Sequence, residues 1–348
     1  MSPLPSRYAP MLASPAGTLP DDLTGWAIEP KWDGIRVIAE VSPRAVHLWT
    51  RNGNDKAPQF PEVVDALTEL AAANGPLVLD GEIVALDAKG RVLRFQALQG
   101  RMHAENESTV ARNARATRTA FVAFDLLAND GRAITSEPWS TRRTALEARI
   151  PARRTGVIRR GESVRCGSPA AAKLFARART DGWEGVLLKR TDSAYSAGRR
   201  TPDWRKVKLE REQEFVIGGF TAPTEGAARD HFGALLVGYF GDDGALHYAG
   251  KVGTGYTQPM LALLAKRLKP LIRARSAFVD APRAGMAHTT WVDPVLVAQV
   301  RYNEMTEAGI LRQPSFLGLR DDKDARDVRL EETGSAAGGI TNGMRCAS

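Results

Sequence analysis

Alternating hydrophobic and polar residues predict a mixed helix and strand structure over residues 26–209. Val63, Val64, Leu67, Leu70 and Ala71 share one face at a helical period, which predicts an amphipathic helix over 62–73. Short runs with buried, strand-forming character predict strands between the helices. The predicted strands are 26–29, 37–41, 77–86, 119–127, 185–189 and 204–209, and the other predicted helices are 141–149 and 169–180.

The hydrophobic pattern changes after Glu210. Strands are predicted over 215–220, 234–240, 246–251 and 295–302, with a hairpin turn at 241–244 and a helix over 258–271. This spacing fits a small β-barrel with one helix. We therefore expect two domains, 1–209 and 210–330, with a boundary near 209–214. Small and polar residues dominate from Gly334 on, which predicts a flexible tail over 331–348.

Composition and charge indicate in which cellular compartment the protein acts and what kind of partner it binds. No apolar run approaches the about 18 residues of a membrane span, and the N-terminus has no apolar signal core. Cys166 and Cys346 are too few for a disulfide framework or a cysteine zinc site, and the five histidines are scattered. We expect a cytoplasmic, nucleoid-associated protein. The net charge of +8 favours polyanions such as nucleic acid.

One short run carries the most specific chemistry. Residues 29–36 contain the pattern K-x-D-G-x-R, and its chemistry is a lysine, Lys31, that attacks a nucleotide phosphorus and carries the nucleotide as a phosphoramidate. A lysine attacks only when neutral, and deprotonation at pH 7 costs roughly 4–5 kcal/mol. We therefore expect nearby cations or burial to lower the pKa of Lys31.

Carboxylates and cations elsewhere meet the other needs of such a site. Glu82 follows a glycine in strand 77–86, and Glu184 precedes a glycine at strand 185–189. Such carboxylates suit Mg²⁺ or Mn²⁺, or a ribose hydroxyl. Lys206 and Lys208 project from one strand face, about 6–7 Å apart, where they could hold an α-phosphate and depress the pKa of Lys31. Each feature alone is more often a solvated residue, so the interpretation depends on their joint order.

That order resembles the ATP-dependent DNA ligases of the covalent nucleotidyltransferase superfamily, from about residue 9 to about residue 330. The resemblance implies an α+β fold, with a nucleotidyltransferase (ATP-grasp-like) adenylation domain followed by a small OB-fold β-barrel. It implies that Lys31 is the adenylated lysine and that Glu29 reads the adenine amino group. Arg36 would lie near the ribose and phosphates, Arg51 would contact ribose or the DNA 5′-phosphate, and Glu82 would lie near the ribose and metal.

The same resemblance assigns the later motifs of the first domain. Phe124 matches the aromatic residue that stacks on adenine, and Glu184 matches the metal-binding motif. Arg200 matches a nucleotide-contacting arginine, and Lys206 and Lys208 match the phosphate-binding lysines.

The second domain resembles bacterial end-joining ligases. Arg320, Asp322 and Lys323 match the last motif, R-x-D-K, which orients the leaving pyrophosphate. The resemblance implies three steps, which are adenylation of Lys31 by ATP, transfer of AMP to the 5′-phosphate at a DNA nick, and attack by the 3′-hydroxyl. Because the R-x-D-K loop must face ATP first and give way to DNA later, we expect a hinge near 209–214.

The position of Lys31 near the N-terminus leads us to expect a stand-alone, monomeric two-domain ligase core. We expect no additional DNA-clamping domain and no fused polymerase or nuclease module. The expected partner is duplex DNA with nicks or breaks, bound weakly and in a salt-sensitive way. Bacterial end-joining proteins are a further expected partner.

Two other functions are compatible with part of this pattern. An RNA ligase or an mRNA-capping guanylyltransferase can use the same K-x-D-G nucleophile, although the match at 312–323 favours a DNA ligase. A non-catalytic basic DNA-binding module is the alternative of another class. Its signature would be loss of Lys31 or of a metal carboxylate, and all of these residues are present.

Overall fold

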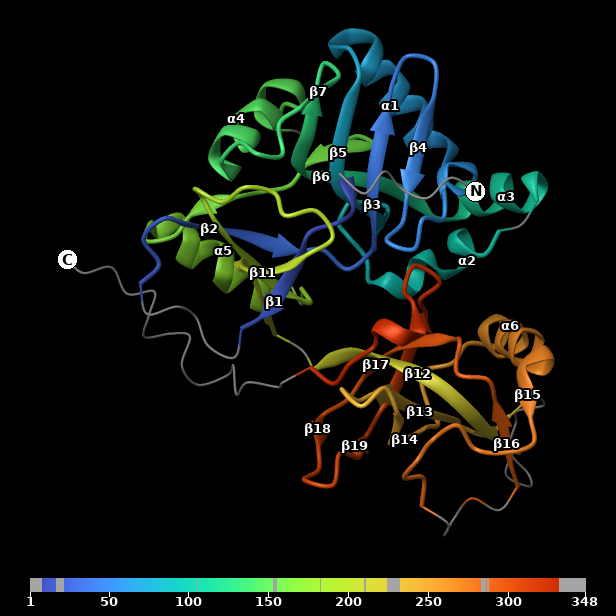
Figure 1. Cartoon of the computed structure of the whole chain (residues 1–348). Coiled ribbons are helices and arrows are strands. Elements are labelled where there is room, and N and C mark those ends of the chain that lie inside the picture. The colour runs from blue at the N-terminus through green and yellow to red at the C-terminus, as the bar shows by residue number, and fades with distance from the viewer. Residues whose placement is uncertain are drawn as a thin grey trace. The chain divides into compact units, whose positions relative to one another are not determined.

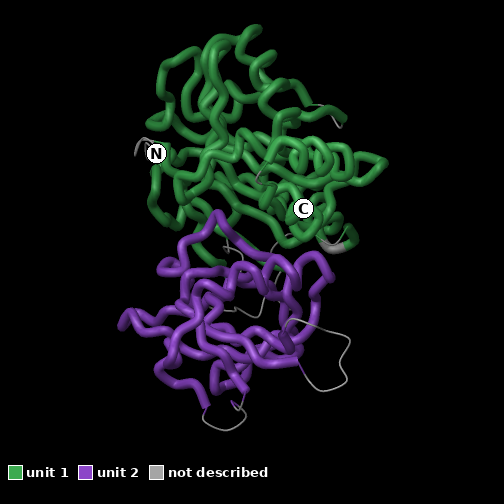
Figure 2. The backbone as a smooth tube through the Cα atoms, turned by 90° about the vertical axis from the view of Figure 1, so that its right-hand side faces the viewer, with its two compact units in different colours: residues 1–209, 332–348 green, residues 210–331 purple. Residues whose placement is uncertain are grey.

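The computed structural model describes residues 8–331 apart from 17–21, 105, 153–154, 182, 210, 224–231, 283–285 and 287 (Figure 1). The chain divides after Leu209 into two compact units (Figure 2). The second unit ends at Glu331. Of the expected tail over 331–348, only Glu331 belongs to the described residues, and the rest lies outside them.

The first unit contains two sheets. One has the strand order β1-β11-β10-β2-β9, and the other has the order β4-β3-β5-β6-β7 with β8 parallel to β6. The strands of the first sheet are β1 (Leu12–Pro15), β2 (Trp26–Lys31), β9 (Val164–Arg165), β10 (Gly185–Arg190) and β11 (Arg200–Lys208). Those of the second are β3 (Ile35–Val41), β4 (Val46–Trp49), β5 (Leu77–Leu86), β6 (Arg118–Asn129), β7 (Arg132–Ala133) and β8 (Ile158–Arg160).

Helices bury the outer apolar face of each sheet. The helices of this unit are η2 (Ala57–Gln59), α1 (Pro61–Asn74), η3 (Phe95–Leu98), α2 (Gln99–Met102), α3 (Glu107–Ala116), α4 (Trp139–Arg149) and α5 (Pro169–Thr180). Val63 and Leu67 of α1 enter the core of the six-stranded sheet, as the helical period predicts. Leu174 of α5 packs against Ile28 and Val186, which occupy one face of the five-stranded sheet. The opposite face of that sheet carries Ala27 and Trp204 of another core cluster as well as polar residues.

The second unit is a curled sheet with one α-helix among its described residues. β12 pairs with β13, β16 and β17, and β17 pairs with β20. The strands are β12 (Glu212–Thr221), β13 (Leu235–Phe240), β14 (Leu246–Val252), β15 (Ile272–Arg273), β16 (Thr289–Val292), β17 (Val297–Arg301), β18 (Glu304–Met305), β19 (Leu311–Arg312) and β20 (Ser315–Leu319). The helices are α6 (Gln258–Leu268), η4 (Lys269–Leu271) and η5 (Ala325–Asp327).

Several elements differ from the sequence prediction. The predicted helix over 258–271 is α-helical only to Leu268, because Pro270 has no N–H for a helical hydrogen bond and the last residues form η4. Helix α3 was not predicted because it has almost no apolar face; the Asn106 side chain caps it by accepting from the Thr109 N–H. Residues 212–214 of the expected hinge lie in β12, paired with β17.

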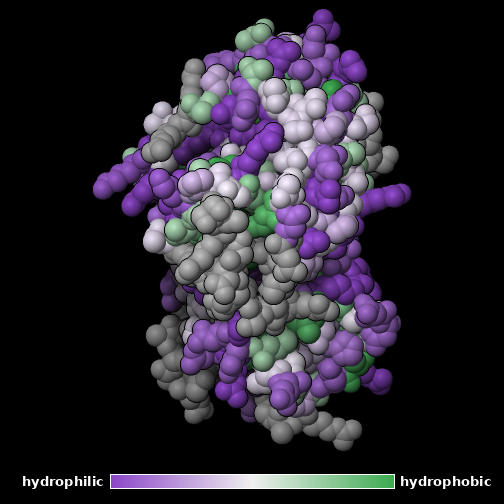
Figure 3. Space-filling model, turned by 90° about the vertical axis from the view of Figure 1, so that its left-hand side faces the viewer, coloured by the Kyte–Doolittle hydropathy of each residue, from purple (hydrophilic) through white to green (hydrophobic). Residues whose placement is uncertain are grey.

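No described helix is long and apolar enough to cross a membrane. Among the residues coloured in Figure 3, hydrophilic ones are more numerous than hydrophobic ones on the face drawn.

Candidate nucleotide site

Three neighbouring strands bring the predicted polar residues to one face of the five-stranded sheet. Gly185 of β10 lies opposite Lys31 of β2 on one side and opposite Lys208 of β11 on the other. Two residues further along, Leu187 lies between Glu29 and Lys206. Directly opposite residues of antiparallel strands point to the same face, as do residues two apart in one strand. The side chains of Glu29, Lys31, Lys206 and Lys208 therefore share one face.

Two glycines allow the backbone to approach closely at this face. A Cβ atom at Gly185 would lie 2.1 Å from the carbonyl oxygen of Val207, so a side chain there would push β10 away from β11. A Cβ atom at Gly34 would lie 2.1 Å from the carbonyl oxygen of Ile83 in β5. The glycine of the K-x-D-G pattern is thus required where the chain leaves Lys31 and enters the second sheet.

The second sheet contributes Arg36 and Glu82, which lie opposite each other on β3 and β5. Arg36 donates two hydrogen bonds to Asp80, at 2.9 and 2.6 Å. Burial lowers the pKa of Arg36, but Asp80 outweighs it and raises the pKa overall. Arg36 therefore provides a fixed positive charge beside Glu82, which also acts on it electrostatically.

Lys31 forms an ion pair with Glu184, whose side chain is only 7% exposed. Burial and the charge of Lys208 lower the pKa of Lys31, as expected from the sequence. Glu184 and Glu82 raise it, and the balance leaves the pKa above its ordinary value. The expected lowering is therefore wrong for the protein as it stands, because the carboxylate of Glu184 contacts the ammonium directly.

Glu82 and Glu184 both act on the Lys31 ammonium, and both are nearly buried. Within the described ranges, no group of three or more histidine, cysteine, aspartate or glutamate side chains is arranged to hold a metal ion. Two carboxylates still suit Mg²⁺, which keeps several waters and binds one or two carboxylates together with substrate phosphates. The donor set thus fits a divalent cation that arrives with a phosphorylated substrate.

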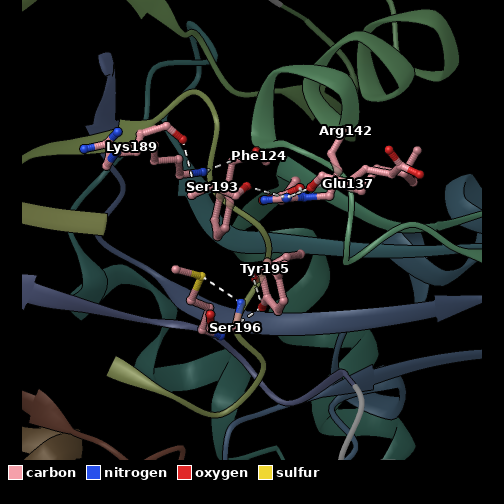
Figure 4. A network of polar contacts seen from close by, with 12 residues as sticks. Phe124, Glu137, Arg142, Lys189, Ser193, Tyr195 and Ser196 are labelled. Atoms are coloured by element: carbon pink, nitrogen blue, oxygen red, sulfur yellow. Dashed lines mark hydrogen bonds and ion pairs between the residues drawn. The ribbon is translucent and has the colours of Figure 1, made fainter. Parts of the chain in front are cut away.

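A buried ion pair lies further along the same face, and sequence reasoning missed one half of it. Lys189 of β10 is fully buried and binds Oε2 of Glu29 at 2.8 Å. It also donates to the carbonyl oxygen of Phe124 at 3.3 Å (Figure 4). The other carboxylate oxygen of Glu29, Oε1, is buried and has no hydrogen-bond partner among the described residues. A buried acceptor of this kind is costly unless a ligand donates to it.

The aromatic residue predicted to stack on adenine is largely covered. Phe124 is 5% exposed, with the Lys189 ammonium 4.6 Å and the Arg36 guanidinium carbon 5.5 Å from its ring centroid. Trp204, which the sequence reasoning assigned no role, lies 6.4 Å from Phe124, measured between ring centroids. Stacking of a base on Phe124 requires more of its ring to be uncovered.

Polar contacts fix the segment behind this aromatic group (Figure 4). The fully buried Arg142 donates to the carbonyl oxygen of Ser193 at 3.0 Å. Tyr195 follows two residues later and donates through its hydroxyl to Asp80 at 2.7 Å. Because Asp80 also binds Arg36, these contacts orient the guanidinium of Arg36.

The remaining predicted residues belong to other segments of the chain. Arg51 is half-buried in the turn after β4, at the edge of the six-stranded sheet. Arg200 is exposed at the first position of β11 and donates to the carbonyl oxygen of Ala13 in β1. Arg320 and Lys323 belong to the second unit, where Arg320 binds Asp322 and Lys323 lies 3.5 Å from Glu214.

Comparison with known proteins agrees with this arrangement. Residues 10–208 match the family described as the ATP dependent DNA ligase domain, and residues 228–323 match the ATP dependent DNA ligase C terminal region. The chain belongs to the ATP-dependent DNA ligases. The predicted family is confirmed, and so is the fold of an adenylation domain followed by an OB-fold barrel.

Individual members of the family match most of this chain. DNA ligase C1 of Mycolicibacterium smegmatis is 33% identical over 342 residues, which cover 95% of this chain and 94% of that protein. The multifunctional non-homologous end joining DNA repair protein LigD of Mycobacterium tuberculosis is 41% identical over 328 residues, which cover 93% of this chain and 40% of LigD. This chain thus spans about two fifths of the length of LigD. A solved structure of mycobacterial DNA ligase D complexed with ATP and MES has 38% identity and a TM-score of 0.66, covering 94% of this chain and all of that one.

Proposed function

We propose that this chain uses ATP to seal breaks between a 5′-phosphate and a 3′-hydroxyl in duplex DNA, through AMP carried on Lys31. The observation that carries the proposal is the alignment of Lys31, Gly185 and Lys208 across three strands. It sets a lysine nucleophile beside a second cation, with Glu184 in contact with the nucleophile. Related chains named as DNA ligases support the same reaction.

In the proposed reaction, neutral Lys31 attacks the α-phosphate of ATP and pyrophosphate leaves. AMP then passes to the 5′-phosphate of the break, and the 3′-hydroxyl displaces it. Phosphoryl chemistry of this kind depends mainly on positioning and on charge stabilisation. Lys206 and Lys208 supply positive charge for the α-phosphate, and Arg320 and Lys323 for the leaving pyrophosphate.

The unpaired oxygen of Glu29 supports its proposed role in recognising adenine. Oε2 is held by Lys189, so Oε1 is left to accept a hydrogen bond from the adenine amino group. Arg36 would contact the ribose and phosphates, and Phe124 would stack on the base. Arg51 is proposed to contact the ribose or the DNA 5′-phosphate, and Arg200 is proposed to contact the nucleotide.

Glu82 and Glu184 are the residues that would hold a divalent cation, Mg²⁺ or Mn²⁺. When bound, such an ion would supply positive charge for the phosphates, and Glu184 would then be shared between it and Lys31. The role left to the chain is to keep Lys31 next to these carboxylates until the substrate arrives.

We propose that the two units act as separate domains, 1–209 and 210–330, joined by a hinge near 209–214. Because 212–214 are paired with β17, the bending would take place before them. We further propose a role in DNA end joining, because LigD of Mycobacterium tuberculosis, named for that process, is 41% identical to this chain. Nicked and broken duplexes are the proposed substrates, end-joining proteins the proposed partners, and a monomer the proposed active form.

Sealing assays test the proposed function. Purified protein is incubated with Mg²⁺ and either ATP or GTP, on nicked DNA and on nicked RNA of the same sequence. The proposal predicts sealing of nicked DNA with ATP. Preferential sealing of RNA would indicate an RNA ligase, and nucleotide transfer from GTP without sealing would indicate a capping-type enzyme. Gapped and blunt-ended duplexes in the same assay identify the preferred lesion.

A further inference from the structure

A buried glutamine in the second unit contacts the arginine of the R-x-D-K motif. Gln299 lies on β17 and is 4% exposed. Its Oε1 accepts a hydrogen bond from an Nη atom of Arg320 at 2.7 Å. Its Nε2 donates to Oε2 of Glu212 at 3.2 Å. A guanidinium can only donate and a carboxylate only accept, so these two partners fix the orientation of the amide.

Both neighbours of Gln299 are held in place by further charged contacts. Arg301 donates to Oε1 of Glu212 from two of its nitrogens, at 2.8 and 2.6 Å. On the other side, Asp322 accepts from Nε and the second Nη of Arg320, at 2.9 and 2.8 Å. Asp322 thus binds the edge of the guanidinium formed by Nε and Nη2, and Gln299 binds the remaining nitrogen, Nη1. Together they set both the position and the rotation of the Arg320 side chain.

The sheet pairs the backbone of Gln299 on both sides, with a register shift in the β17–β20 pair between Gln299 and Val300. In β17 Gln299 lies opposite Glu214 of β12 and opposite Gly318 of β20, so both sides of its strand are hydrogen bonded. Arg320 follows β20 directly, and its N–H donates to the carbonyl oxygen of Val297 at 2.8 Å. The contact between Gln299 and Arg320 therefore joins two segments that already lie side by side in the sheet.

We infer that Gln299 is a positioning residue that holds the Arg320 guanidinium for adenylation of the lysine. The inference rests on the proposed function, in which Arg320 stabilises the leaving pyrophosphate. Gln299 itself contacts no substrate in this account, and it acts only through Arg320. Its loss should therefore slow the step that needs Arg320 and leave the later steps unchanged.

The test compares Q299L with Q213L in the full chain. Gln213 is a matched control: it is 2% exposed on the adjoining strand β12, and its amide binds the backbone of Arg329 and Glu331 instead of Arg320. Three quantities are measured for each variant: the rate of self-adenylation with labelled ATP, the rate of sealing of a pre-adenylated nick, and the melting temperature.

Loss of a hydrogen bond to a charged group predicts that Q299L slows self-adenylation about 10- to 100-fold. Sealing of the pre-adenylated nick should stay within about twofold of wild type, and Q213L should leave both rates near wild type. The double variant E212Q/Q299E keeps an acceptor for Arg320 and restores a donor and acceptor pair between positions 212 and 299. It should recover most of the self-adenylation that Q299E alone loses.

Two results would overturn the inference. One is self-adenylation by Q299L within about twofold of Q213L, and the other is an equal loss of both steps with a lowered melting temperature, which a purely structural role predicts. If Q299L does not fold, failure of E212Q/Q299E to exceed Q299E overturns it instead. Wild-type protein that forms no lysine adenylate would refute the proposed function itself, a result distinct from all of these.

Discussion

Lys31 and Glu184 form an ion pair at the point where Lys31 of β2 lies opposite the first residue of β10. This contact raises the pKa of the proposed nucleophile, although burial and Lys208 act in the opposite direction. This contact favours the charged lysine, whereas attack on phosphorus needs the neutral amine. Adenylation requires that Glu184 be drawn away or neutralised.

The first prediction concerns the pKa of Lys31 in metal-free protein. E184Q should lower this pKa, because it removes the largest contribution that raises it. Competitive labelling of Lys31 with acetic anhydride across pH, followed by mass spectrometry, measures the change. Addition of Mg²⁺ should shift the wild-type pKa in the same direction and have little effect on E184Q.

E162Q is the matched control, because Glu162 forms an exposed ion pair with Arg177. The pKa of Lys31 should be the same in E162Q and wild type. The raised pKa of Lys31 also makes the stability of the fold depend on pH. The ion pair contributes its full stabilisation below the pKa of lysine in the unfolded chain, about 10.4. This stabilisation is lost as the pH rises through the higher pKa of Lys31 in the folded protein. A Lys31 pKa that is equal or higher in E184Q would contradict the electrostatic account.

The second prediction concerns the buried pair of Glu29 and Lys189. E29A leaves an uncompensated ammonium in a buried site and should cost about 3–5 kcal/mol in the free energy of unfolding. The double variant E29L/K189M removes both charges and should regain most of this stability, as measured by urea unfolding. Its self-adenylation should nevertheless stay low, because the acceptor for the adenine amino group is gone.

Inosine triphosphate, which has no amino group on the base, separates recognition from stability. Wild-type protein should prefer ATP over inosine triphosphate by about 10-fold or more, and E29L/K189M should lose this preference. An unchanged preference for ATP would show that Glu29 does not recognise the base.

The sequence predicted which residues form this site better than it predicted their ion pairs and pKa shifts. The alternation of residues along β2, β10 and β11 is local, so it predicts which side chains share a face. The Lys189 pair with Glu29 depends on how β2 and β10 align, which no local pattern specifies. The direction of the Lys31 pKa shift likewise depends on a contact between residues far apart in the chain. The covered ring of Phe124 also depends on the packing of the two sheets.

Local rules also explain which elements could be predicted. Helix α1 has a regular apolar face and was predicted within one residue at each end. Helix α3 contains little apolar surface, so only its Asn106 cap marked it in the sequence. The short strands β15, β18 and β19 are two residues each, too short for any period to be recognised.

The third prediction separates the roles of the two units. R320A should slow self-adenylation about 100-fold and leave sealing of a pre-adenylated nick within about threefold of wild type. R326A is the control, since Arg326 lies on η5 of the same unit and packs over the Phe240 ring. Equal loss of both steps in R320A would count against a role limited to the first step.

The fourth prediction concerns DNA affinity. The chain carries a net charge of +8, and binding through phosphate contacts releases counterions. For a nicked duplex that lacks the 3′-hydroxyl, the logarithm of the association constant should fall with the logarithm of salt concentration. Five or more phosphate contacts predict a slope of about −4.5 or steeper. A slope near −1 would refute recognition through the DNA backbone.

The central claim is that Lys31 carries AMP from ATP to DNA. The most direct test incubates protein freed of bound AMP with α-labelled ATP and Mg²⁺, maps the labelled residue by mass spectrometry, and then adds nicked DNA. The account predicts label on Lys31, its transfer to DNA, and no adduct in K31R. Absence of an adduct in wild-type protein, or equal labelling of K31R, would contradict it.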